Sequence, residues 1–271
     1  MDLNVISPGH AKAEEDHRRE LCVAGRWLRD RGFVVATQGN VSVRLDAGRI
    51  LVSPRFRSKG TLNPQSIVVA DLEGRQLVGE GDTSTEIGMH LLFYRLRPDV
   101  NAVCHAHPPV ACSFAASQMP LNKALLAEMV VALGSVPVAP FGMPGTPELA
   151  DSLAPFVPHH DAILLSNHGA VTCGADLLSA FYNMELLEQY ARVALFTELL
   201  GKQSLLSASD VERLLAARKR YGVRLSRVPG ILPIITSGDG SYEEPPERVT
   251  MTRAELEALI EEALRNDRAR R

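Results

Sequence analysis

The chain has 271 residues, of which 45% are hydrophobic and 23% charged, a composition that supports one sizeable buried core. Its formal net charge of -3 offers no broad positive surface, so we expect neither nucleic acid nor an anionic membrane as a partner. No apolar run is long enough to span a bilayer, residues 1–20 are too polar for a secretory signal, and the cysteines lack paired spacing. We therefore expect a cytoplasmic protein with reduced thiols.

Hydrophobic periodicity predicts a mixed α/β fold. A helix over residues 11–31 ends at Gly32, and three short strands follow near residues 41–45, 50–53 and 67–70. A second helix begins near Glu86, and a strand runs from residue 101 to residue 107. The remaining predicted elements are a helix from about Pro109, strands near residues 136–139, 162–166 and 171–172, and a long helix over residues 177–200.

Two histidines lie two residues apart at the end of the predicted strand over residues 101–107. Residues two apart in a strand project from the same face, so His105 and His107 point the same way. His168 follows a second apolar run and precedes Gly169, which predicts a tight turn between two strands. Three neutral imidazoles form a catalytic metal site when further coordination positions stay open. The alternative is that these are ordinary strand-end histidines, satisfied by backbone carbonyls.

Glu86 has two interpretations at the start of its helix. Thr83 and Glu86 have the spacing of a capping box, in which the glutamate side chain reaches back to the cap amide. Alternatively, Ser84 and Thr85 add hydroxyls and free backbone amides at the same helix start, which favours an anion site. A carboxylate beside a metal and a phosphate-sized anion site is suited to proton transfer.

Five motifs, in order along the chain, resemble the class II aldolase and adducin head-domain family over about residues 14–200. They are Gly39-Asn40-Val41-Ser42-Val43-Arg44, Ser84-Thr85-Glu86, Arg97-Pro98-Asp99 leading into His105-Ala106-His107, Ala139-Pro140 with Gly145-Thr146-Pro147-Glu148-Leu149, and Asn167-His168-Gly169. The resemblance implies a three-layer α/β fold, in which helices flank a central, mostly antiparallel sheet. It also implies a homotetramer with active sites between subunits.

The same resemblance implies residue roles. One divalent metal per subunit, with Zn²⁺ favoured and Mn²⁺, Fe²⁺ or Co²⁺ as alternatives, is held by His105, His107 and His168. Glu86 is the acid/base, and the substrate phosphate is bound by Asn40, Ser84 and Thr85.

The activity that the resemblance implies is that of a metal-dependent aldolase of carbohydrate metabolism. It would cleave a ketose 1-phosphate, such as L-fuculose or L-rhamnulose 1-phosphate, to dihydroxyacetone phosphate and an aldehyde through a metal-stabilised enediolate. Epimerases of the family carry an aspartate at the position of Glu86, so the glutamate favours aldol cleavage.

Two positions depart from the pattern of the fuculose enzyme. Its Pro-Thr-Gly phosphate loop is replaced by residues 54–60, where Arg55, Arg57 or Lys59 could hold a phosphate or a carboxylate. We assign Arg55 to substrate binding, and the alternative is a solvated basic turn. Glu128 falls near the tyrosine that the fuculose enzyme takes from a neighbouring subunit as a second acid, and its alternative is a solvated surface residue.

Two other functions stay open at this point. A metal-dependent decarboxylase of a hydroxylated aromatic acid would use the same histidines as an electron sink and Arg55 or Arg57 to hold the carboxylate. A non-catalytic scaffold like the adducin head would need no metal site, and the presence of the three histidines and Glu86 argues against it.

The C-terminal region lies outside the resemblance. We expect a catalytic domain over residues 1–230, a linker over residues 231–250 and an amphipathic helix over residues 251–271. The apolar stripe of the expected helix consists of Leu256, Leu259, Ile260, Ala263 and Leu264. Such a short helix is not stable alone. It therefore docks either on its own oligomer or, like the encapsulation peptides that it resembles, on a shell or core partner in a bacterial microcompartment.

Overall fold

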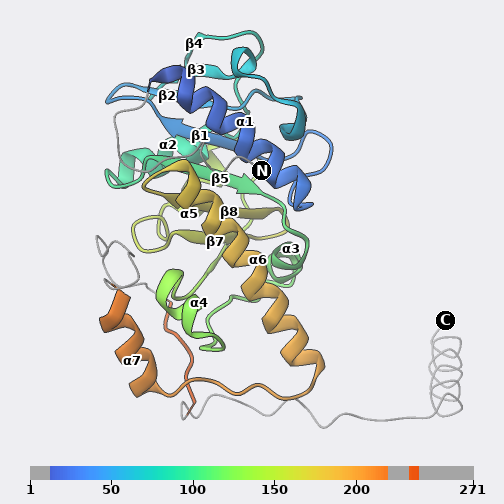
Figure 1. Cartoon of the computed structure of the whole chain (residues 1–271), viewed down its shortest axis with the longest axis vertical. Coiled ribbons are helices and arrows are strands. Elements are labelled where there is room, and N and C mark those ends of the chain that lie inside the picture. The colour runs from blue at the N-terminus through green and yellow to red at the C-terminus, as the bar shows by residue number, and fades with distance from the viewer. Residues whose placement is uncertain (1–12, 219–231, 238–271) are drawn as a thin grey trace, which may run out of the picture. The chain divides into compact units, whose positions relative to one another are not determined.

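A computed structural model describes residues 13–218 and 232–237 of the chain. The described strands form one eight-stranded sheet in the order β4-β3-β2-β1-β5-β8-β7-β6 (Figure 1). Neighbouring strands are antiparallel except β6 and β7, which run parallel. The expected mostly antiparallel sheet is confirmed. The strands are β1 (Asn40–Arg44), β2 (Arg49–Val52), β3 (Val68–Asp71), β4 (Gln76–Val78), β5 (Ala102–Ala106), β6 (Val138–Ala139), β7 (Ala162–Leu165) and β8 (Gly169–Gly174).

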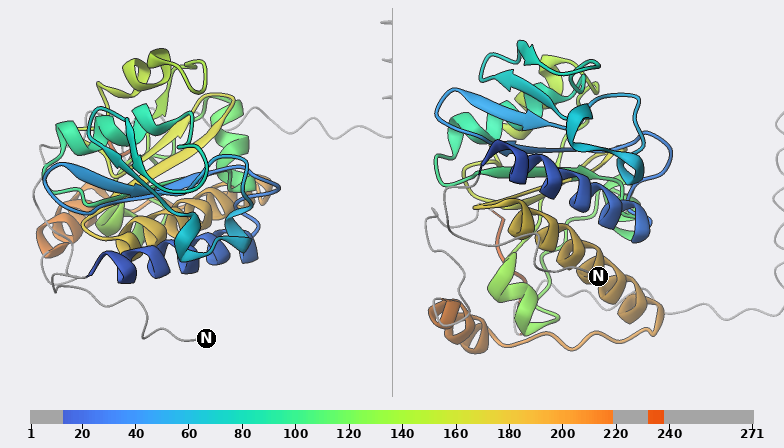
Figure 2. Two further views of the ribbon diagram at one scale, coloured as in Figure 1. Left: turned by 90° about the horizontal axis from the view of Figure 1, so that it is seen from above. Right: turned by 45° about the horizontal axis from the view of Figure 1, so that its top comes forward.

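Helices cover both faces of the sheet, which confirms the expected three-layer α/β fold. One face is covered by α1 (Glu14–Asp30), α3 (Pro109–Ala116) and α6 (Leu177–Leu199). The other face is covered by α2 (Ile87–Leu96) and α5 (Pro147–Leu153). Figure 2 shows α1 and α6 side by side on their face of the sheet. Two further helices, α4 (Ala127–Ala132) and α7 (Ala208–Ala217), pack against each other.

Side chains on the central strands alternate between the two layers. Val41 and Val43 of β1 belong to the apolar cluster under α1 and α6, so Asn40 and Ser42 face the α2 layer. The register of β1 against β5 pairs Asn40 with His105. The fold therefore gathers the polar side chains of these two central strands beneath α2.

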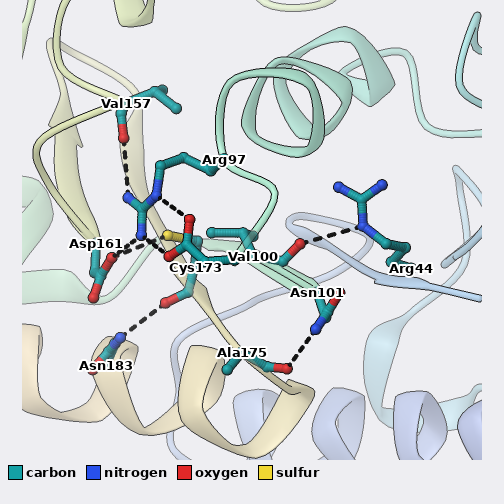
Figure 3. Close-up of polar contacts among 10 residues, drawn as sticks. Arg44, Arg97, Val100, Asn101, Val157, Asp161, Cys173, Ala175 and Asn183 are labelled. Carbon is teal, nitrogen blue, oxygen red and sulfur yellow. Dashed lines mark hydrogen bonds and ion pairs between the residues drawn. The ribbon is translucent and has the colours of Figure 1, made fainter. Parts of the chain in front are cut away.

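A buried arginine fixes the connection between α2 and β5. Arg97 is 5% exposed, and its guanidinium lies beside Asp161 and the carbonyl of Val157 (Figure 3). It also forms an ion pair with Asp99. Its guanidinium donates to Asp99 at 2.8 and 2.7 Å, to Asp161 at 3.1 Å and to the carbonyl of Val157 at 3.1 Å. Breaking a buried ion pair by removing one partner costs about 3–5 kcal/mol. This network therefore holds the start of β5, and with it the register of the histidines that follow.

Several described elements were not predicted from the sequence. All three residues of β4 are exposed, so this edge strand shows no apolar alternation. The helices α4 and α5 have six and seven residues, too few for a clear helical period, and the ten-residue helix α7 was also not predicted. None of the helices in the described ranges combines the length and the apolar character that a membrane crossing requires.

Residues 232–237, which we placed in the linker, lie against the described core. The backbone N–H of Ile235 donates to the carbonyl of Asn122 at 2.7 Å, and its carbonyl accepts from Ala124 at 2.9 Å. The rest of the expected linker and the helix expected over residues 251–271 lie outside the described residues. The domain boundaries and the docking or encapsulation role of that helix stay predictions.

Candidate metal centre and active site

Three histidines from two parts of the chain meet at one end of the central strands. His105 lies on β5, His107 follows the end of β5, and His168 lies in the turn between β7 and β8. One ligand nitrogen from each ring lies within 4.8 Å of the others, and the ring centroids are 4.8–5.2 Å apart. Within the described ranges, this is the one cluster of histidine, cysteine or acidic side chains that meets the geometry of a metal site.

Local backbone geometry explains why His168 reaches the other two rings. Asn167 adopts φ 55°, a left-handed conformation that asparagine tolerates better than most residues, and this closes the β7–β8 turn. Gly169 then lies against His107: a Cβ at this position would stand 2.6 Å from His107 Cδ2 and 2.8 Å from the carbonyl oxygen of Ala106. The Asn-His-Gly sequence therefore supplies the turn, the ligand and the space for the facing ring.

The hydrogen bonds of His105 determine which of its nitrogens faces the cluster. Its Nδ1 lies 2.9 Å from the carbonyl oxygen of Ala170, so Nδ1 carries the proton and donates it. Burial lowers the pKa of His105 to about 3, and the ring is neutral. The unprotonated Nε2 therefore points at His107 Nε2, which lies 3.2 Å away. In metalloproteins a backbone carbonyl commonly accepts a hydrogen bond from the ring nitrogen that does not bind the metal, and so orients the imidazole.

The cluster fits a divalent metal. Burial, assisted by the neighbouring His168, also lowers the pKa of His107 to about 4, so this ring too is neutral and free to bind a cation. Three imidazole nitrogens suit zinc and its first-row neighbours, and they leave coordination positions for a substrate.

Glu86 lies beside the three rings and does not cap its helix. It precedes α2, and its side chain makes no capping hydrogen bond, so the capping-box interpretation is wrong. One carboxylate oxygen lies 3.1 Å from His168 Nε2, and the other lies 3.5 Å from His105 Nε2 and accepts from Asn40 Nδ2 at 2.7 Å. Burial alone would raise the pKa of Glu86. The neighbouring rings of His105 and His168 and the Asn40 amide outweigh burial and hold this pKa well below its ordinary value.

The residues assigned to phosphate binding lie around Glu86. Asn40 and Ser84 are buried, and Asn40 Nδ2 donates to the Ser84 hydroxyl at 3.0 Å. Thr85 is exposed and, with Glu86 and Thr146, lines a cavity of about 750 Å³ between the start of α2 and the start of α5. The carboxylate that is suited to proton transfer therefore borders a space large enough for a small metabolite.

The protein-family model named Class II Aldolase and Adducin N-terminal domain matches residues 19–195 of the sequence. The chain belongs to the class II aldolase and adducin family. A 3-oxo-tetronate 4-phosphate decarboxylase from Haemophilus influenzae is 36% identical over 191 residues, which are 69% of this chain and 90% of that protein. A 5-deoxy-D-ribulose 1-phosphate aldolase from Bacillus thuringiensis is 30% identical over 211 residues, 77% and 98% of the two chains. A solved L-fuculose 1-phosphate aldolase superposes with a TM-score of 0.71 at 31% identity and covers 78% of this chain and 100% of that one.

These named relatives of the class II aldolase family are lyases, which confirms the expectation of an enzyme of this class. Family membership also agrees with the expected use of a divalent metal, and the histidine cluster is a group of side chains that could hold one.

The basic loop, where the chain departs from the fuculose enzyme, is only partly a solvated turn. Arg55 is exposed and pairs with Asp82 at 2.5 Å, just before Ser84. Lys59 is buried, and its Nζ donates to the carbonyls of Thr37 at 3.0 Å and Arg57 at 2.8 Å. Burial lowers the pKa of Lys59 to about 8, against the opposing attraction of Glu86. The solvated interpretation is therefore wrong for Lys59, whose burial nothing in the local sequence indicates.

Glu128, the expected second acid, is exposed in the first turn of α4. That helix packs on α7 and α6, and the structure does not bring Glu128 into contact with the three histidines. The expected role concerned a neighbouring subunit, so it stays a prediction. Sequence reasoning also missed the roles of His90 and Ser42, which lie directly behind Asn40.

Proposed function

We propose that this protein is a metal-dependent aldolase that cleaves a ketose 1-phosphate to dihydroxyacetone phosphate and an aldehyde. The observation that carries the proposal is the position of the Glu86 carboxylate, which lies 3.1 Å from His168 and 3.5 Å from His105 at the edge of the histidine cluster. Retro-aldol cleavage begins when a base takes a hydroxyl proton, and a carboxylate beside the metal site is placed to accept it. Relatives named as aldolases of ketose 1-phosphates support the substrate class.

The residues divide the work between binding and proton transfer. His105, His107 and His168 would hold the metal, for which we propose Zn²⁺, and the bound ion would stabilise negative charge on the substrate as a Lewis acid. Glu86 takes the proton of the hydroxyl on the aldehyde-forming carbon. The carbon–carbon bond then breaks and its electron pair stays on the dihydroxyacetone phosphate half. Glu86 returns the proton to the carbon of that half from which the bond was broken.

We assign the substrate phosphate to the helix start next to Glu86. The hydroxyls of Ser84 and Thr85 lie at the N-terminus of α2, where backbone N–H groups and the helix dipole favour an anion. Arg55, on the loop bridged to Thr83, would exchange its partner Asp82 for the phosphate. The donors of Asn40 are already engaged by Ser84 and Glu86, so we give Asn40 a smaller share in phosphate binding.

A second candidate is decarboxylation of a phosphorylated 3-oxo sugar acid. The 36% identical Haemophilus influenzae relative, named as such a decarboxylase, favours it. Loss of carbon dioxide needs no initial base, and an ionised Glu86 repels a substrate carboxylate, which is why we place aldol cleavage first. The named relatives act on phosphorylated sugars or sugar acids, so we rank aromatic hydroxy acids below both.

Product analysis separates the two reactions. The zinc-loaded protein is incubated with L-fuculose 1-phosphate, L-rhamnulose 1-phosphate, 5-deoxy-D-ribulose 1-phosphate and 3-oxo-tetronate 4-phosphate, and both dihydroxyacetone phosphate and carbon dioxide are measured. The aldolase proposal requires dihydroxyacetone phosphate from at least one ketose phosphate. If carbon dioxide is released from the sugar acid and no ketose phosphate is cleaved, the aldolase proposal is wrong and the protein is a decarboxylase.

A further inference from the structure

A continuous line of buried hydrogen bonds runs from the interior of α2 to Glu86. The hydroxyls of Tyr94 and Ser42 lie 2.7 Å apart, and Ser42 Oγ lies 2.7 Å from His90 Nδ1. His90 Nε2 lies 2.5 Å from Asn40 Oδ1, and Asn40 Nδ2 donates to Glu86 at 2.7 Å. Each of the four residues behind Glu86 is at most 4% exposed. They are not metal ligands and are not needed for the proton transfer itself, so their arrangement has another purpose.

The chemistry at the Glu86 end sets the direction of every bond in this line. The Glu86 carboxylate only accepts, so the Asn40 amide must turn its NH₂ group toward Glu86 and its carbonyl oxygen toward His90. That oxygen requires His90 to carry its proton on Nε2. The lone pair on Nδ1 then accepts from Ser42, and Ser42 accepts from Tyr94.

We infer that His90 is a positioning residue: its Nε2–H holds the Asn40 amide in the one orientation that donates to Glu86 and so places the catalytic carboxylate beside the histidine cluster. If the amide turned over, its oxygen would face the carboxylate, and two acceptors would oppose each other. Ser42 has the supporting role, because its hydroxyl selects the Nε2–H tautomer. Removing a residue that orients a metal ligand typically costs about 10–100-fold in metal affinity or activity, and we expect a loss of activity of the same order when the orientation of Asn40 is lost.

The inference rests on the proposed function only for its kinetic test. His90→Leu removes the donor and replaces the ring with an apolar side chain of similar bulk. His90→Gln keeps an N–H donor close to the position of Nε2. We expect His90→Leu to lower kcat about 10–100-fold with little change in KM or in zinc content, and His90→Gln to recover most of the loss. A rise in KM at constant kcat would mean that Asn40 serves the substrate phosphate instead, and would overturn the inference. If kcat falls equally in both variants and both lose zinc, His90 has only a structural role.

A second measurement does not depend on activity. In metal-free protein labelled with ¹⁵N-histidine, with the His90 signals assigned by comparison with His90→Gln, we expect the chemical shifts of the neutral Nε2–H tautomer. Ser42→Ala should weaken that tautomer preference without unfolding the protein. An Nδ1–H tautomer in the wild type would refute the inference. If the tautomer is as expected but no substrate is cleaved, the proposed function has failed and the positioning role stands.

Discussion

The narrow gap between Gly169 and His107 makes Gly169→Ala a sharp test of the site geometry. The added Cβ would lie 2.6 Å from His107 Cδ2 and 2.8 Å from the carbonyl oxygen of Ala106. Carbon atoms in contact prefer about 3.5–4.0 Å, so one of the groups must move by about 1 Å. Ala106 belongs to the central strand β5, paired on both sides, so the groups that give way are the His107 ring and the turn that carries Gly169 and His168.

Displacing a metal ligand by this distance weakens metal binding. We expect Gly169→Ala to lower zinc affinity about 10–100-fold, in line with losses seen when the support of a ligand is disturbed. Overpacking should also lower the free energy of unfolding by about 1–3 kcal/mol. Gly48→Ala is the matched control, because its added Cβ meets only an Asp46 oxygen at 3.9 Å. Calorimetric zinc titrations and urea unfolding of both variants measure the effects. Zinc affinity of Gly169→Ala equal to that of Gly48→Ala would refute the reasoning.

Three further outcomes follow from the same site. His107→Ala should lose most bound zinc. Glu86→Gln should keep its zinc, and its rate of cleavage should fall about 10²–10⁴-fold. Equal zinc loss in both variants would mean that Glu86 is chiefly a metal ligand. The pKa values of His105 and His107, about 3 and 4, lie below the ordinary 6.5, so the unfolded metal-free chain binds more protons than the folded one between about pH 4 and 6.5. The free energy of unfolding should therefore fall as the pH falls through that window, by up to about 1.4 kcal/mol per pH unit for each ring, and a flat urea-unfolding profile would contradict these values. Lys59, with a pKa lowered from 10.5 to about 8, destabilises the fold below pH 8, and this effect fades as the pH rises to 10.5. The stability of the wild type relative to Lys59→Met should then rise between pH 8 and 10, and a constant difference would mean that Lys59 has an ordinary pKa.

The parts of the site that were predictable from sequence are those fixed by local spacing. The two-residue interval between His105 and His107 places both side chains on one face of any strand. The turn over Asn167–Gly169 is indicated by asparagine and glycine, which are common in turns and tolerate a positive φ. Their convergence needs the antiparallel pairing of β5 with β8, which no local pattern contains.

Two features depend entirely on long-range packing. The choice at Glu86 between capping its own helix and facing the histidines was open in the sequence, and it is decided by Asn40, which β1 brings from 46 residues away. His90 has the periodicity of an ordinary apolar helix position, and only the strand beneath it turns the ring into a donor for Asn40. Burial of Lys59 is likewise invisible in a run of basic residues.

The central claim is that the three histidines and Glu86 form one metal-dependent lyase site. The most direct measurement is the release of dihydroxyacetone phosphate from L-fuculose 1-phosphate by protein of known metal content, before chelation, after it, and after zinc is restored. We expect about one divalent ion per chain, loss of cleavage when the ion is removed, and recovery of cleavage when it is returned. Cleavage that persists after the metal is removed, or a purified protein that binds no divalent ion, would contradict the central claim.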